Sequence, residues 1–462
     1  MTRTEWDTPP GGVVTPPVPT NPRGGSAKPR EGSAAGHGRH TSAGTNAVFR
    51  ARRVSLALVV VLALTTVGLV VARSGGNAAA HSRRTASAAQ PPSSHLARHS
   101  GALGAGTSLP FASPSGRGMA PGPNLAPGSD PAALPGDVLI ADEDNSRLVV
   151  VNPAGAVVWQ FPGRGSLPAG TTFLRPDDGF FAPNGREILA TEETDQVVSL
   201  IGLRSQRILW RYGTPGVPGA GANQLSNPDD ALLLPNNDVV IADIRNCSIL
   251  VTKVGLHVPL QRFGIQDTYC YHEPPLRFGS PNGAFPLTDG NYIVTEINGD
   301  WVDEMTPSGK ILWSTHPPGV AYPSDTNEVS SGVFVTVDYS KPGQVVEFNS
   351  KGQLLWRYGP KSGPGMLNTP SLCEPIPTNG DFLCNDDSND RVIVIDPRTD
   401  KIVWQYGHTG VEGTGPGYLS GPDGVDLAPP YSMLVRHRAT IGLPTLTCAP
   451  GLPPGACTVL GH

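Results

Sequence analysis

Residues 237–243 read Asn-Asp-Val-Val-Ile-Ala-Asp, a short apolar run that starts at a turn residue and ends in a carboxylate. The same pattern recurs along the chain at 136–142, 185–192, 237–243, 290–296, 332–338 and 380–386. Each copy is followed by an aromatic closing phrase, in which one position holds Trp159, Trp210, Gln261, Trp313, Trp356 and Trp404. The spacings are 51, 51, 52, 43 and 48 residues. A period near 50, built from β-type runs and turns, is typical of propeller blades.

A third phrase, Leu-x-Pro or Leu-x-x-Pro with an apolar run, follows most closing phrases. It occurs at 174–182, 225–234, 278–287, 321–329, 367–376 and 419–428. The first repeat has no such phrase before it, and the last phrase has no complete unit after it. We therefore expect 419–428 to supply the innermost strand of the blade that opens at Gly136, which removes free sheet edges. The predicted fold is all-β, a six-bladed β-propeller over 136–438 closed by its N- and C-terminal strands.

Composition and charge agree with a β domain and exclude other classes. The 56 Gly and 49 Pro among 462 residues are too many for a chain dominated by long helices. Residues 1–130 hold 13 basic and 4 acidic side chains (+9), whereas 131–462 hold 21 and 35 (−14). Such an acidic domain repels nucleic acid, so we expect no nucleic-acid partner.

The N-terminal part predicts a membrane anchor. Val54–Ala72 is a run of 19 residues without a charge, long enough for one transmembrane helix. The alternative is a cleaved signal peptide. Both the 19-residue apolar run and the 53 residues before it are too long for one. Arg50, Arg52 and Arg53 place the N-terminus in the cytoplasm and the rest outside the cell membrane. Residues 1–53 and the Ala/Ser/Gly/Pro-rich stalk 73–135 are predicted to be disordered, and 439–462 to form a Pro/Gly-rich tail.

All cysteines lie in the exported part, where disulfides persist: Cys247, Cys270, Cys373, Cys384, Cys448 and Cys457. Six cysteines allow 15 pairings, so their spacing alone does not select one. Cys373 and Cys384 are symmetric about Thr378-Asn379, and a tight turn there would place them opposite each other on antiparallel strands. Cys448 and Cys457 are expected to close a small loop in the tail.

Two recurring features are interpreted as structural. The Trp found at this position in five of the closing phrases is expected to pack between neighbouring blades. The strand-end carboxylates are expected to accept hydrogen bonds from turn N–H groups, including those near Asn145, Asn246 and Asn389. They are Asp142, Asp243, Glu296, Asp338 and Asp386. The histidines of the domain are scattered over loops and closing phrases, and His272 or His316 could reach inward on a long loop.

The repeats resemble two propeller families. Asp142, Asn145 and Arg147, like Asp386, Asn389 and Arg391, resemble the V-A-D and N-x-R-I phrases of NHL repeats. The phrase at 395–404 resembles PQQ-binding-like blades, and arylsulfotransferase-type bacterial propellers are similar more distantly. The PQQ resemblance implies a bound quinone, but PQQ dehydrogenases are similar to eight-bladed rings, whereas six blades are predicted here. The arylsulfotransferase resemblance implies a histidine nucleophile facing the channel. The positions expected to face it here are Asp177, Asp229, Asn282, Ser324, Ser371 and Asp423, none of them His.

Acidic residues at the entry to the inner strands are the strongest candidates for a site. Asp177-Asp178, Asp229-Asp230, Asp423 and the run Ser324-Asp325-Thr326-Asn327 come from different blades and are expected to converge on one axis. Carboxylates from several strands suit Ca²⁺, which takes six to eight oxygen ligands. The predicted ligands are Asp177, Asp178, Asp229, Asp230 and Asp325. The alternative is that Pro-Asp-Asp and Pro-Asp-Gly are ordinary turns.

The sequence is compatible with three functions. The first is a membrane-anchored, extracytoplasmic scaffold that binds a protein or glycan at the cell surface. The second is an enzyme, a hydrolase, lactonase or lyase in which Ca²⁺ polarises an oxygen and Asp178 or Asp230 moves a proton. The third, by resemblance alone, is an enzyme that handles a quinone or a sulfate ester.

Overall fold

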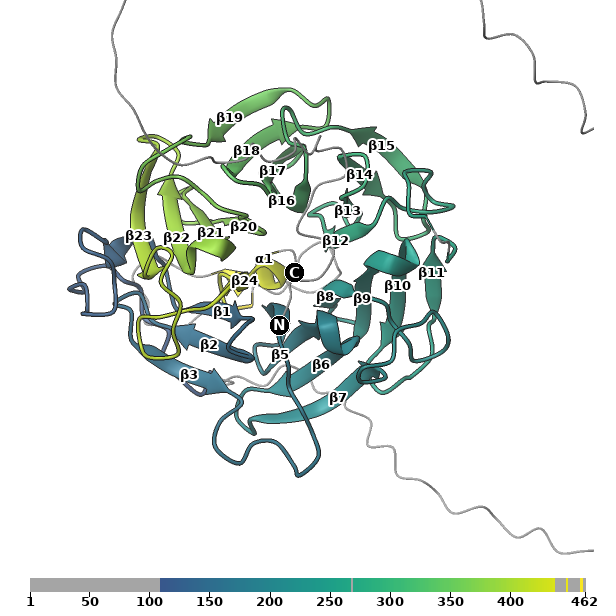
Figure 1. Ribbon diagram of the computed structural model, residues 1–462, viewed down its shortest axis with the longest axis horizontal. Coiled ribbons are helices and arrows are strands. Elements are labelled where there is room, and N and C mark those ends of the chain that lie inside the picture. Colours follow the sequence, from purple (N-terminus) through teal and green to yellow (C-terminus); the bar gives the residue numbers. More distant parts are fainter. Residues whose placement is uncertain (1–108, 267–268, 437–445, 448–457, 460–462) are drawn as a thin grey trace, which may run out of the picture. The chain divides into compact units, whose positions relative to one another are not determined.

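Six four-stranded antiparallel sheets surround one axis in the computed structural model, and each sheet is one blade of a β-propeller (Figure 1). The structure describes residues 109–266, 269–436, 446–447 and 458–459. In each blade the strands follow the chain from the axis outward, except that the first blade takes its inner strand from the C-terminal end. The predicted six-bladed all-β fold is therefore confirmed.

The strands form three sets. The inner strands, next to the axis, are β24 (Pro422–Leu427), β4 (Pro176–Phe181), β8 (Pro228–Leu233), β12 (Pro281–Pro286), β16 (Pro323–Ser330) and β20 (Cys373–Pro375). The two middle strands of each blade are β1 (Val138–Asp142) and β2 (Arg147–Val151), β5 (Glu187–Glu192) and β6 (Val197–Gly202), β9 (Asp238–Asp243) and β10 (Ser248–Lys253), β13 (Tyr292–Glu296) and β14 (Trp301–Met305), β17 (Val333–Asp338) and β18 (Gln344–Asn349), and β21 (Phe382–Asp386) and β22 (Arg391–Asp396). The outer strands are β3 (Val157–Phe161), β7 (Arg207–Gly213), β11 (Gln261–Phe263), β15 (Ile311–Thr315), β19 (Leu354–Tyr358) and β23 (Lys401–Gly407).

Helical segments are few and short among the residues that the structure describes. They are the 3₁₀ turns η1 (Pro131–Ala133), η2 (Glu193–Asp195), η3 (Ile244–Asn246) and η4 (Asp387–Asn389), and the helix α1 (Met433–Arg436). A separate hairpin pairs β25 (Leu446–Thr447) with β26 (Thr458–Val459). No helix in the part of the chain that the structure describes is long and apolar enough to cross a membrane, and the predicted span 54–72 lies outside that part.

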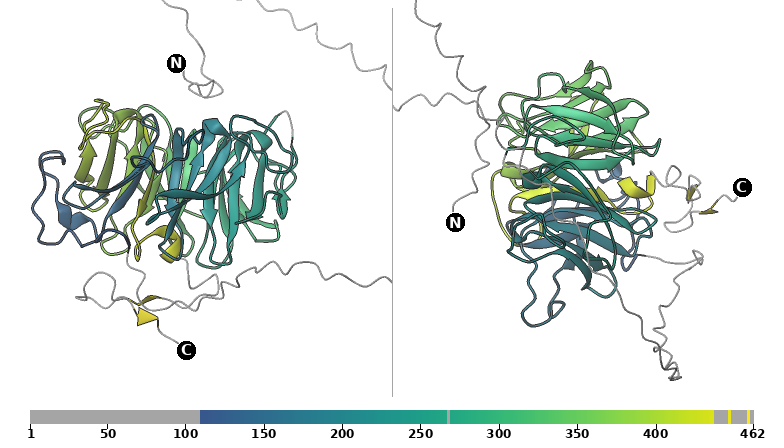
Figure 2. Two further views of the ribbon diagram at one scale, coloured as in Figure 1. Left: turned by 90° about the horizontal axis from the view of Figure 1, so that it is seen from below. Right: turned by 90° about the vertical axis from the view of Figure 1, so that its right-hand side faces the viewer.

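The ring is closed by β24, which pairs with β1 from Val138↔Leu427 to Asp142↔Pro422. This is the predicted closure. After β24 the chain forms α1, which lies near the centre of the ring in Figure 1 and at one face of it in Figure 2. Met433 and Leu434 are buried there in the same cluster as Phe180 and Phe285. Phe180 and Phe285 lie near the C-terminal ends of β4 and β12, so this part of the apolar cluster is at the C-terminal ends of the inner strands.

The recurring tryptophans join neighbouring blades, as predicted. The indole N–H groups of Trp159, Trp210 and Trp404 donate to backbone carbonyls of the next blade, at Leu203, Leu256 and Pro153. Trp356 donates to the Asp400 carboxylate of the next blade at 2.9 Å. Trp313 differs, because its indole donates to Glu304 in its own blade.

The strand-end carboxylates have the structural role expected, but their donors differ from the prediction. Backbone N–H groups that enter the inner strand, such as Ser420 to Asp142, bind them instead of N–H groups of the following turn. The side chains of Asn145, Asn246 and Asn389 donate to the preceding carboxylate. An arginine completes four of these arrangements, in the pairs Asp142–Arg147, Glu192–Arg211, Asp243–Arg262 and Asp386–Arg391.

Part of the predicted stalk packs against the propeller. Residues 109–135 run along the first and last blades, where Ala126 N donates to Gln405 O and Asp130 N donates to Val403 O. Leu125 and Leu134 are buried in the core. The prediction of a disordered stalk up to residue 135 is therefore corrected, because these apolar side chains gain burial at the outer edge of β23. The predicted segments 1–53 and 73–108 lie outside the described residues.

Two disulfides join strands or loops within the ring. Cys373 and Cys384 are directly opposite each other on β20 and β21 and are bonded, which confirms the pair argued from the turn. Cys247 is bonded to Cys270, a pair that the spacing did not select. Cys448 and Cys457 lie outside the described residues.

We predict that deleting residues 418–462 destabilises the propeller far more than deleting residues 439–462. The longer deletion removes β24 and leaves β1 with an unpaired edge. The measurement is thermal unfolding of the two shortened chains under oxidising conditions. Equal unfolding temperatures would show that β24 contributes nothing to ring closure.

Candidate metal centre

A β-bulge lies at the acidic residues of three inner strands. The register shifts between Pro176 and Gly179 in β4, between Pro228 and Ala231 in β8, and between Pro323 and Thr326 in β16. In a regular strand, successive side chains point to opposite faces, whereas a bulge re-aims one of them. The bulge in β8 therefore explains how the consecutive Asp229 and Asp230 come to share one site.

The inner strands bring four carboxylates together. Asp178, Asp229, Asp230 and Asp325 come from β4, β8 and β16, and each offers an oxygen within 4.8 Å of the others. Asp178, Asp230 and Asp325 are at most 2% exposed. We call these four residues the deep group.

A second group, the mouth group, consists of Glu143, Asp177 and Asp423, whose carboxylate oxygens also lie within 4.8 Å of one another. Glu143 and Asp423 are partly exposed, unlike the deep group. Arg175 approaches this group, with one guanidinium nitrogen 2.6 Å from Glu143 Oε1. Because Arg175 pairs only with Glu143 and Asp144 among the described residues, most carboxylates of the two groups have no ion pair with a basic side chain.

Polar contacts to the deep group are incomplete. Asn282 donates to Ser324 Oγ at 3.0 Å and to Asp325 Oδ1 at 3.4 Å. Asn282 and Ser324, two of the six positions predicted to face the channel, therefore lie beside the deep group. Both carboxylate oxygens of Asp230 and Oδ1 of Asp178 are buried without a hydrogen-bond partner. A buried carboxylate without a partner is costly, which indicates that this group accepts either protons or a cation.

Two glycines leave the space that the carboxylates occupy. A Cβ at Gly283 would lie 2.6 Å from Asp230 Oδ2 and 2.7 Å from Asp325 Oδ1. A Cβ at Gly424 would collide with Asp178. Glycine is thus required at both positions for the aspartates to converge.

Burial is the main electrostatic influence at the axis. It raises the pKa values of Asp178, Asp229 and Asp230 well above their ordinary range, and the charge of Asp325 raises them further. Burial also raises the pKa of Asp325 to about 7. At the mouth, burial and then the charge of Asp423 raise the pKa of Glu143 to about 8.

The structure places the predicted ligands in two neighbouring groups. Four of them form the deep group, and Asp177 lies in the mouth group. Asn327, counted with the acidic phrase, instead donates to Cys373 O and belongs to neither group. Sequence reasoning missed Glu143, although a second acidic residue directly follows a strand-end carboxylate there and at Glu192-Glu193.

Histidines contribute to neither axial group among the described residues. His316 packs against Trp301, with ring centroids 3.7 Å apart, and His408 lies against Tyr418. A cavity of about 470 Å³ lies elsewhere, between residues 126–129 and the outer parts of the last two blades. Its lining includes no residue of the deep or mouth group.

Comparison with known proteins agrees with the propeller fold. The family model of the outer membrane protein assembly factor BamB matches residues 266–420, which is 155 of the 462 residues. No curated protein matches the chain.

Solved structures are similar at low identity. A protein of unknown function from Bacteroides caccae is 18% identical, with a TM-score of 0.44 over 63% of this chain and 97% of that one. A streptogramin B lyase is 12% identical, with a TM-score of 0.43 over 63% and 86%. An inactive variant of virginiamycin B lyase from Staphylococcus aureus with quinupristin is 13% identical, with a TM-score of 0.39 over 56% and 76%. The chain is thus a six-bladed β-propeller that, over residues 266–420, is similar to the BamB family.

Proposed function

We propose that this protein is an extracytoplasmic propeller that binds a protein or glycan at the cell surface through a Ca²⁺ site at its axis. The observation that carries the proposal is the deep group, in which four buried carboxylates from three blades converge and neither oxygen of Asp230 has a donor other than a neighbouring carboxyl group. Ca²⁺ prefers oxygen ligands and neutralises clustered carboxylates. The space left by Gly283 and Gly424 supports a built site over a set of ordinary turns.

The mouth group is where a ligand would meet the cation site. Glu143 and Asp423 are partly exposed, and they lie at the N-terminal ends of the inner strands, away from the apolar cluster around α1. A ligand therefore approaches from the acidic end of the ring. Hydroxyl and carboxylate oxygens of a glycan or an acidic peptide are suitable ligands for Ca²⁺.

The cellular location is part of the same proposal. The uncharged run Val54–Ala72, with Arg50, Arg52 and Arg53 before it, supports a single membrane anchor. The two disulfides support an oxidising compartment for the propeller, since such bonds are rare in the cytosol.

A second candidate function is metal-assisted acid–base catalysis, favoured by Glu143. Its carboxyl is partly exposed, and its pKa of about 8 would leave it protonated near neutral pH, as a general acid requires. This enzyme would be a hydrolase, lactonase or lyase. Turnover of lactone or aryl ester substrates that needs Ca²⁺ and is lost in Glu143→Gln would favour it over the binding module.

We expect Ca²⁺ to stabilise the metal-free protein. A cation bound only by the folded state raises the free energy of unfolding by about 2.7 kcal/mol at 100 times Kd. For a domain of this size the unfolding temperature then rises by a few degrees. Asp178→Asn and Asp230→Asn should each reduce this shift while the metal-free protein stays as stable or becomes more so, because a repulsive charge has gone.

The matched control for this measurement is Asp289→Asn, which changes an exposed carboxylate in the β12–β13 turn. It should leave the calcium response unchanged. Absence of a calcium response in the wild type, with loss of metal-free stability in both axial variants, would instead assign these aspartates to ordinary turns.

The buried carboxyl groups of Asp325 and Glu143 make the free energy of unfolding depend on pH. Their folded-state pKa values are raised, so the unfolded chain releases protons at lower pH than the folded one. The stabilisation is complete below the ordinary pKa of about 4 and is lost as the pH rises through the folded values, about 7 for Asp325 and about 8 for Glu143.

We therefore expect Asp325→Asn to flatten the pH dependence of unfolding in the metal-free protein between about pH 4 and pH 7. Asparagine keeps the acceptor for Asn282 but cannot ionise. The measurement is the difference in unfolding free energy between variant and wild type, determined at several pH values in EDTA. A difference that stays constant over this range would show that Asp325 does not titrate there.

A further inference from the structure

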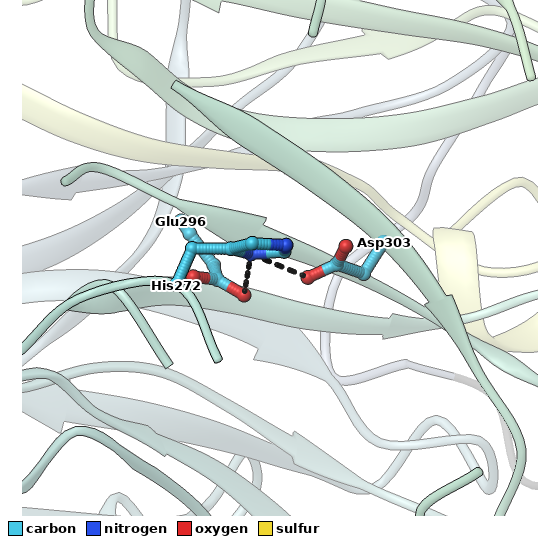
Figure 3. A group of neighbouring side chains, drawn as sticks. All are labelled: His272, Glu296 and Asp303. Atoms are coloured by element: carbon cyan, nitrogen blue, oxygen red, sulfur yellow. Dashed lines mark hydrogen bonds and ion pairs between the residues drawn. The ribbon is translucent and has the colours of Figure 1, made fainter. Parts of the chain in front are cut away.

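A third cluster of potential ligands lies away from the axis, in the blade β12–β15. It consists of Glu296 at the end of β13, Asp303 on β14 and His272 on the loop before β12. Figure 3 shows His272 Nδ1 facing both carboxylates. This nitrogen lies 3.1 Å from Glu296 Oε1 and 3.7 Å from Asp303 Oδ2.

The blade β4–β7, which lies two positions away in the ring, shows what this position contains when its role is only structural. There Glu192 accepts hydrogen bonds from Ser199 at 2.6 Å and from Arg211 at 2.9 Å. The arginine also donates to Ser199. One carboxylate and one guanidinium balance each other's charge.

Strand register places the two blades in direct correspondence. Ser199 is opposite Ala190 and Arg211, and Asp303 is opposite Val294 and Ser314. Glu296 thus corresponds to Glu192, Asp303 to Ser199 and Ser314 to Arg211. The β12–β15 blade has gained a carboxylate and lost the arginine.

This exchange leaves two buried carboxyl groups beside each other without an arginine of the kind that pairs with Glu192. Glu296 and Asp303 are fully buried, and when Asp303 is ionised neither of its oxygens accepts a hydrogen bond, so it either shares a proton with Glu296 or binds a cation. A protonated His272 would balance only one of the two carboxylates. A divalent cation would balance both, with His272 as a neutral nitrogen ligand.

We propose that His272, Glu296 and Asp303 form a site for a divalent transition-metal ion of the Zn²⁺ type, separate from the axial calcium site. The donor set of one imidazole and two carboxylates suits Zn²⁺, whereas Ca²⁺ and Mg²⁺ prefer oxygen ligands alone. Bonds of about 2.0–2.2 Å to a tetrahedral ion separate its ligands by roughly 3.4 Å, close to the separations around His272 Nδ1. Three protein ligands leave one position for water or a bound ligand.

Surrounding contacts hold the histidine in place. Its ring stacks on Trp301, with centroids 4.2 Å apart and planes 13° apart. The Cys247–Cys270 disulfide ties the loop two residues before His272 to the start of β10. Asn298 donates to Cys270 O at 3.2 Å, which fixes the same loop from the other side. Preorganised ligands of this kind are expected of a metal site.

The test is titration of the EDTA-treated, desalted full chain with Zn²⁺ in the presence of saturating Ca²⁺, followed by calorimetry. We expect one equivalent of Zn²⁺ to bind to this site, with affinity lowered at least tenfold in His272→Ala. Co²⁺ should give a visible d–d absorption band that the same variant loses. Asp178→Asn with Asp230→Asn should leave Zn²⁺ binding unchanged, which separates this site from the axial one.

The decisive variant is the double substitution Asp303→Ser with Ser314→Arg, which installs the polar set of the β4–β7 blade. It should fold with unchanged or higher thermal stability and should lose Zn²⁺ and Co²⁺ binding. Zn²⁺ binding that persists in this variant and in His272→Ala would overturn the proposal, as would a wild-type protein with its disulfides intact that binds neither ion. His272→Ala provides the comparison if the double variant does not fold.

Discussion

The pairing of β24 with β1 is the constraint on which the rest of the structure depends. It makes the first blade four-stranded and brings Asp423 beside Glu143 and Asp177. It also places α1 over the apolar end of the ring, where Met433 N donates to Asp426. A chain without this pairing would have neither a closed axis nor a complete mouth group, so ring closure and the candidate centre depend on one set of backbone hydrogen bonds.

The repeating pattern was sufficient to predict the number of blades, their boundaries and their closure, because the phrases at 136–142 and 419–428 show where the repeat begins and ends. The Cys373–Cys384 pair followed from turn geometry. The convergence of Asp178, Asp230 and Asp325 was predicted from their place in the repeat. The separation of Asp177 into the mouth group was not predicted, because it depends on bulges that have no strict sequence signal. The charge exchange at Asp303 and Ser314 also required the strand register, since neither residue lies in the acidic phrase.

The six blades keep one structural carboxylate in the repeat but differ in the side chain that pairs with it. The strand-end carboxylate anchors the entry to the inner strand in each blade, through backbone donors such as Ser420 N, Leu174 N and Ser226 N. Its side-chain partner differs from blade to blade: arginine in four, the Gln344 amide beside Asp338, and His272 beside Glu296. Because the backbone donors keep the carboxylate in place, the partner can change without loss of the blade.

The position of β24 at the end of the fold also affects how the protein is made. The pairing joins Val138 to Leu427, 289 residues later, and a polypeptide emerges from the ribosome with its N-terminus first. The edge of β1 therefore has no strand to pair with until the other five blades have been synthesised. Open sheet edges of this kind invite association with other chains. Biogenesis of this propeller thus includes an interval in which a chaperone, or rapid stacking of the later blades, must protect one strand.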